Sequence, residues 1–149
     1  MLRTLVCTLM LMATPLALAQ SQDQSPKRFG DILIYFSPFN SSYVAPEVAA
    51  NVGLERAPDK GVLNVAVQRQ TADGPEPVDA RVTGTVQTLI GQPQPLDFIR
   101  VKEEDALYFV TNYGASTRSV LRFVVNVQPE EGGPVHTLNF QREFFPDDE

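Results

Sequence analysis

Hydrophobic and polar residues alternate along most of the chain from Phe29 onward, and a period of two predicts β-strands. The alternation is clearest between Val78 and Thr88, where valine, alanine and glycine positions alternate with Asp, Arg, Thr and Gln. Such a strand has one buried and one solvated face, as is common in antiparallel sheets. The same pattern predicts seven strands, over residues 29–36, 62–70, 78–88, 96–101, 106–113, 121–128 and 135–145.

Turn-forming residues separate these strands at intervals of about a dozen residues. The clearest are Asp73-Gly74-Pro75, Gly91-Gln92-Pro93 and the segment from Glu131 to Pro134. Short strands with regularly spaced turns are typical of a β-sandwich or a β-barrel.

One segment departs from the β pattern. The run from Pro46 to Gly53 predicts a short helix, because proline suits the first helical position and glycine suits a left-handed cap. Val48 and Val52 are four residues apart, so one side of this helix is predicted to seal an end of the sandwich. We therefore predict an all-β fold. It is an immunoglobulin-like antiparallel β-sandwich of about seven strands with one short helix between strands 1 and 2, and a small closed β-barrel is the alternative.

The first 19 residues have the three parts of a secretory signal peptide. Arg3 gives a positive start, Leu5 to Met12 is apolar, and Ala17-Leu18-Ala19 predicts cleavage between Ala19 and Gln20. The apolar run is too short to span a bilayer, which needs roughly 20 residues. The alternatives are an uncleaved anchor or a buried core helix.

The predicted layout is a cleavable signal (1–19), a flexible polar leader (20–28), a single β-sandwich domain (29–146) and an acidic tail (147–149). The single cysteine, Cys7, lies in the signal, so the mature chain is expected to form no disulfide and no cysteine-based site. The net charge is −6, and loss of Arg3 with the signal makes it −7. An acidic chain without a basic stripe disfavours binding to nucleic acid or anionic lipid, and no membrane insertion is expected after cleavage.

No motif in the sequence carries recognisable catalytic or metal chemistry. His136 is the only histidine, and with no cysteine in the mature chain it cannot form a typical zinc site, so we interpret it as a half-buried residue at the rim. Neither a G-x-S-x-G nor an S-x-x-K motif is present. Acidic clusters at 103–105, 130–131 and 147–149 lack the spacing of a calcium loop and are interpreted as solvated. No catalytic residue, metal or cofactor is predicted.

The candidate binding loop is the aromatic stretch from Tyr35 to Tyr43, with the sequence YFSPFNSSY. Phe36, Phe39, Asn40 and Tyr43 combine aromatic rings with small polar neighbours, a composition that is frequent at binding surfaces. The alternative is that Phe39 and Tyr43 pack under the helix and cap the core.

Four sequence segments resemble one known family: RFGDILIYFSPFNSS, PEVAANVGLER, GVLNVAV and GQPQPLDF. They are similar to the domain of unknown function 4426, a family of uncharacterised secreted proteobacterial proteins, and the likeness runs from about residue 28 to 144. The resemblance implies a periplasmic location and a single β-rich domain, and it supplies no catalytic residues.

Three functions remain open. The leading hypothesis is a non-catalytic periplasmic binding or accessory module that recognises a protein or an envelope component through a loop end or a strand edge. The second is a carboxylate-dependent enzyme, for which Asp31, Asp97 and Glu143 are the candidate acids. The third is a structural or scaffold protein without a ligand.

Overall fold

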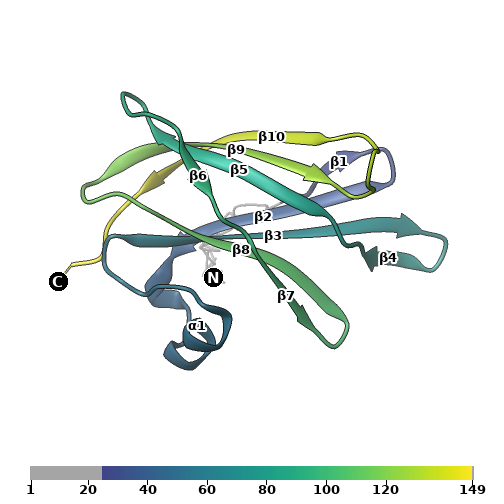
Figure 1. Ribbon diagram of the computed structural model, residues 1–149, viewed down its shortest axis with the longest axis horizontal. Helices are drawn as coiled ribbons and strands as arrows, with labels where there is room; N and C mark the ends of the chain where they lie inside the picture. The colour runs from purple at the N-terminus through teal and green to yellow at the C-terminus, as the bar shows by residue number, and fades with distance from the viewer. Residues whose placement is uncertain (1–24, 149) are drawn as a thin grey trace, which may run out of the picture.

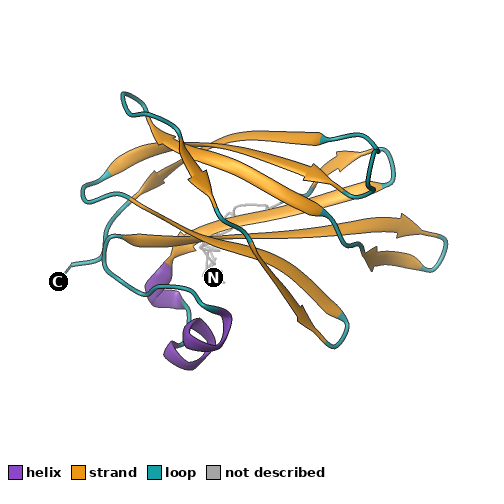
Figure 2. Ribbon diagram, in the orientation of Figure 1, coloured by secondary structure: helices purple, strands orange, loops and turns teal. Residues whose placement is uncertain are grey.

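The computed structural model describes residues 25–148, which form two antiparallel sheets packed face to face (Figure 1, Figure 2). Sheet A contains, in spatial order, β1 (Lys27–Phe29), β2 (Ile32–Asn40), β3 (Lys60–Thr71), β8 (Ala106–Gly114) and β7 (Ile99–Glu103), with β4 (Gly74–Pro77) paired to β3. Sheet B contains β10 (His136–Phe144), β9 (Ser119–Gln128), β5 (Arg81–Thr88) and β6 (Gln94–Leu96).

This strand order is that of an immunoglobulin-like sandwich. Strands β2, β3, β8 and β7 take the places of A, B, E and D in one sheet, and β10, β9 and β5 take those of G, F and C in the other. The predicted fold class is confirmed. The strands of residues 25–148 lie in two separate open sheets, so the barrel alternative does not apply.

The described residues form ten strands where the sequence predicted seven. The first predicted strand is in fact a hairpin, since β1 turns at Gly30-Asp31 and pairs with β2. Lys27 and Arg28, predicted to lie in the leader, therefore belong to β1. The short strands β4 and β6 were missed because their prolines are typical of turns and edges.

The core lies between the sheets and is rich in aromatic rings. The ring of Phe123 stacks on Phe140 at 4.8 Å between centroids, and Tyr113 meets Phe123 edge-on at 5.0 Å. Burial raises the pKa of Tyr113 to about 12. Gly61 lies opposite Tyr113 on the neighbouring strand, and a Cβ there would come within 2.3 Å of the tyrosine ring. Only glycine leaves room for this ring.

The predicted helix is present as α1 (Pro46–Val52) and ends at Gly53 in the left-handed conformation, with φ of 91°. A short 3-10 turn, η1 (Ser41–Tyr43), precedes it. The helix was predicted to seal an end of the sandwich, and it does not. It lies over the outer face of sheet A, where Val48 and Val52 approach Phe39 and Val62 (Figure 1).

Within the described part of the chain, no helix has the length and hydrophobicity needed to cross a bilayer.

Candidate functional site

The four residues of the candidate binding loop do not form one loop. Strand β2 continues to Asn40, so Phe36 and Phe39 lie in a strand and point to opposite faces of sheet A. Phe36 faces the core, where its ring centroid lies 4.5 Å from that of Phe140. Phe36 is therefore a core residue. Tyr43 lies in η1 with 82% of its surface exposed, so it does not pack under the helix.

Asn40 holds the C-terminal tail in place. Its Nδ2 group donates hydrogen bonds to the carbonyl of Phe145 at 2.8 Å and to the carboxylate of Asp147 at 2.9 Å. The Asp147 amide donates to the carbonyl of Pro58 at 2.9 Å. Hydrogen bonds from Ser42 and Asn40 hold the pKa of Asp147 below its usual range. The contacts of Asn40 are structural, and they tie the end of β2 to the chain that follows β10.

Phe39 contributes to an apolar cleft of about 190 Å³ between α1 and the outer face of sheet A. Valines of α1, β3, β7 and β8 form most of its walls. At its edge the Oδ1 atom of Asn64 is buried and has no hydrogen-bond partner within residues 25–148. The chain after the helix is fixed by Asn112, whose side chain accepts a hydrogen bond from the Glu55 amide at 2.8 Å and donates to the Glu55 carbonyl at 3.0 Å.

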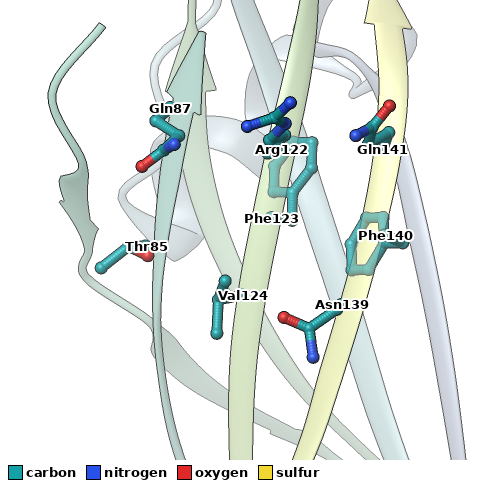
Figure 3. A pocket seen from close by; sticks show the side chains of 8 residues that line it. All are labelled: Thr85, Gln87, Arg122, Phe123, Val124, Asn139, Phe140 and Gln141. Carbon is teal, nitrogen blue, oxygen red and sulfur yellow. The ribbon is translucent and has the colours of Figure 1, made fainter. Parts of the chain in front are cut away.

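The outer face of sheet B is polar and carries no covering segment among the described residues (Figure 1). The register of β5, β9 and β10 aligns its side chains in three rows, which are Thr83–Asn126–Thr137, Thr85–Val124–Asn139 and Gln87–Arg122–Gln141. A shallow hollow of about 250 Å³ lies over the last two rows (Figure 3). Arg122 is the one charged residue in these rows.

The edges of the two sheets differ in how they are protected against pairing with another chain. Short length, proline and charged side chains are the usual protections. Strands β1 and β6 have three residues each, and β6 contains Pro95. Strand β4 has four residues with two prolines, and the free part of β2 contains Pro38. Strand β7 has five residues and carries Arg100, Lys102 and Glu103.

Strand β10 is the exception among the described edges. It has nine residues, pairs with β9 without a bulge from His136 to Phe144, and has no partner strand on its other side. No Asp, Glu, Lys or Arg occurs in it before Arg142. Its row of unpaired backbone groups is a template for a further strand.

The candidate acids of the enzyme hypothesis do not converge on one site. Asp31 and Glu130 flank Arg69, at 3.3 and 2.8 Å, at one end of the sandwich. Glu143 pairs with Arg118 at 2.6 Å, and Asp97 is exposed in the segment between β6 and β7.

The only histidine, His136, was predicted to be half-buried at the rim, and it is partly buried and stacks on Phe29 at 4.6 Å. Across residues 25–148, no three His, Cys, Asp or Glu side chains gather closely enough to hold a metal ion.

Sequence reasoning missed the β10 edge and the Gln87–Arg122–Gln141 row. The alternation of β5 and β9 already indicated one solvated face on each strand. The pattern within a strand does not reveal which strands are neighbours, and so it could not bring the two glutamines to either side of Arg122. The predicted signal cleavage at Ala17, Ala19 and Gln20 lies outside the described residues.

The chain matches the family described as Domain of unknown function (DUF4426) over residues 26–147. No curated protein matches it. A crystal structure of a DUF4426 family protein from Pseudomonas aeruginosa PAO1 is similar, with 39% identity and a TM-score of 0.75, covering 86% of this chain and 99% of that one.

Two structures of FetP from uropathogenic Escherichia coli strain F11 share the fold at 10% identity. The protein as isolated after expression in the periplasm gives a TM-score of 0.61, covering 83% of this chain and 94% of that one. A copper-bound variant gives 0.59, covering 85% and 93%. At this identity the likeness concerns the fold alone. The family match and the Pseudomonas structure agree over nearly the whole described region, and the chain belongs to the DUF4426 family.

Proposed function

We propose that this protein is an exported, periplasmic accessory module that binds a partner protein by adding one extended segment of the partner to β10. The single observation that carries the proposal is that the β10 edge lacks the usual protections against pairing with another chain. Strand β10 is long, free of bulges and uncharged as far as Gln141, whereas every other edge of the described sheets is short, interrupted by proline or charged. Strand addition to such an edge is a common mode of peptide recognition.

The side chains on the inner and outer sides of β10 indicate the chemistry of the partner segment. On the inner side, aromatic pairs close the seam between the sheets, namely Phe36 with Phe140 and Phe29 with His136. On the outer side, Thr137, Asn139 and Gln141 present polar groups. Side chains of an added strand alternate between these two sides. The partner segment is therefore extended, with apolar and polar residues in alternation.

The location in this proposal is supported by the signal-like residues 1–19 and by an acidic, cysteine-free mature sequence. The proposal needs no catalytic group, in agreement with the separate ion pairs of Asp31 and Glu143.

A photo-crosslinking amino acid placed in turn at Thr137, Asn139 and Gln141 tests the proposal in the native cell. Strand pairing predicts crosslinks to one partner, and moving the probe by two residues should move the crosslinked position by two residues. The matched controls are Thr83 and Thr85, on the same face of the interior strand β5, where no such series is expected. Crosslinks to a second copy of this chain, or crosslinks without a register, would overturn the proposal.

A further inference from the structure

The Gln87–Arg122–Gln141 row places a guanidinium group between two carboxamides on three neighbouring strands. Arg122 pairs in register with Gln87 on β5 and with Gln141 on β10. Figure 3 shows the Arg122 side chain between the two glutamines. Arginine offers parallel N–H groups that match the two oxygens of a carboxylate, and each carboxamide adds two N–H donors.

These polar groups are not used by the protein itself. No hydrogen bond or ion pair within residues 25–148 engages the side chains of Thr85, Gln87, Arg122, Asn139 or Gln141. The nearest acidic residue along β10 is Glu143, and its carboxylate is already paired with Arg118 at 2.6 Å. Arg122 is therefore the one charged residue that lines the hollow, and no carboxylate within residues 25–148 pairs with it. The Arg122 guanidinium therefore complements a ligand that carries one negative charge.

The neighbouring row of side chains indicates the chemistry of the rest of the ligand. Thr85, Val124 and Asn139 form the next row on the same face. Each lies two residues from its counterpart in the Gln87–Arg122–Gln141 row, a displacement of about 7 Å. Asn139 and Thr85 offer donors and acceptors suited to hydroxyl groups, while Val124 between them offers an apolar surface. A pyranose ring has one rather apolar C–H face and hydroxyl groups at its rim.

The hollow over the two rows has a volume of about 250 Å³. Ligand pockets in proteins usually measure roughly 300–1,000 Å³, so this hollow holds one small unit, such as a single monosaccharide. All of its walls come from β5, β9 and β10, and sites built on strands are held more rigidly than sites on loops.

We propose that the outer face of sheet B binds a sugar acid, with the carboxylate on Arg122 between Gln87 and Gln141 and the ring over Val124 between Thr85 and Asn139. This site is independent of strand addition at β10, which uses backbone groups at the edge of the sheet. The ligand is a carboxylate-bearing sugar unit, free or within a polysaccharide.

The test compares galacturonate with galactose, which differ only by a carboxylate in place of a hydroxymethyl group. Binding is followed by two-dimensional NMR on the mature protein. Galacturonate should shift amide signals of β5, β9 and β10 and should bind roughly tenfold or more tightly than galactose, as expected for a hydrogen bond to a charged group. Equal binding of the two sugars would overturn the proposal, and so would galacturonate shifts confined to other strands or no binding at all.

Two substitutions separate the parts of the site. Arg122→Gln should abolish the difference between the two sugars, while Arg28→Gln, the same change of charge on sheet A, should preserve it. Asn139→Ala should weaken galacturonate binding several-fold and leave acetate binding unchanged. If acetate or inorganic phosphate binds the native protein as tightly as galacturonate, the face takes any small anion and the assignment to a sugar acid is wrong.

Discussion

The outer faces of the two sheets differ, although both sheets enclose the same core. On sheet A, Phe39 and Val62 are covered by α1 and the chain that follows it. On sheet B, threonine, asparagine and glutamine side chains surround Arg122 without a covering segment among the described residues. The difference separates a face that stabilises the fold from a face that is available to a ligand.

The sequence pattern of each strand reflects this difference. In β3 the adjacent residues Val62 and Leu63 are 1% and 0% exposed, so this strand is buried on both faces. In β5 only one face is apolar, and valines alternate with threonine and glutamine. A continuous apolar run thus marks a strand with a cover, and strict alternation marks a strand with one bare face.

The largest expected effect comes from truncating the covered face. Phe39→Ala should lower the free energy of unfolding by about 3 kcal/mol, because it leaves a cavity beneath α1. Val124→Ala on the bare face should lower it by less than about 1 kcal/mol. Urea unfolding of both variants measures the difference. Losses of equal size would show that α1 adds no burial to sheet A and would remove the contrast.

The core between the two sheets provides a reference for the comparison of the two outer faces, because changes on either face should leave its pH dependence unaltered. The pKa of Tyr113 is about 12 in the folded protein, against an ordinary value of about 10, because burial disfavours its anion. The unfolded chain loses this proton first, so stability should fall as the pH rises from 10 to 12, by up to about 2–3 kcal/mol. Tyr113→Phe should remove this fall, and Phe39→Ala and Val124→Ala should retain it. Alkaline unfolding curves that are identical for the native protein and Tyr113→Phe would contradict the assignment.

Two asparagines provide a matched pair of smaller changes. Asn112 on sheet A fixes the chain after α1 through three hydrogen bonds with the backbone of Glu55 and Gly61. Asn126 on sheet B accepts one exposed hydrogen bond from Thr137. Asn112→Ala should cost about 1–2 kcal/mol and Asn126→Ala less than about 0.5 kcal/mol. Thermal unfolding distinguishes them, and a reversed order would mean that the loop after the helix does not depend on Asn112.

The smallest expected effect has the opposite sign. Asn64→Leu replaces a buried oxygen that has no partner in the described structure, so stability should stay the same or rise by up to about 1 kcal/mol. Asn139→Leu on the bare face, where the side chain is exposed, is the control and should change stability by less than about 0.5 kcal/mol. A clear loss in the Asn64 variant, measured by calorimetry, would show that this oxygen is satisfied in solution.

The fold class and the ends of α1 could be predicted because they depend on local sequence. Gly53 ends the helix as its lack of a side chain suggests, and the alternation of β5 and β9 gives their buried faces. The site could not be predicted, since the register that aligns Gln87, Arg122 and Gln141 joins strands that are far apart in the chain. The sequence allowed Phe39 either to join a binding loop or to pack under the helix, and the structure places it under α1. Nothing near Asn40 in the sequence indicates that it anchors the tail, because its partners lie more than 100 residues away.

The anchoring of the tail by Asn40 also has a kinetic consequence. Its hydrogen bond to Phe145 joins residues 105 positions apart, and the Phe36–Phe140 contact joins the same two regions. Contacts over such separations slow folding, because a long loop must close before they form. The seam between β2 and β10 is thus among the last parts of the molecule that can form during synthesis, and the sandwich closes only after the C-terminal residues have been made.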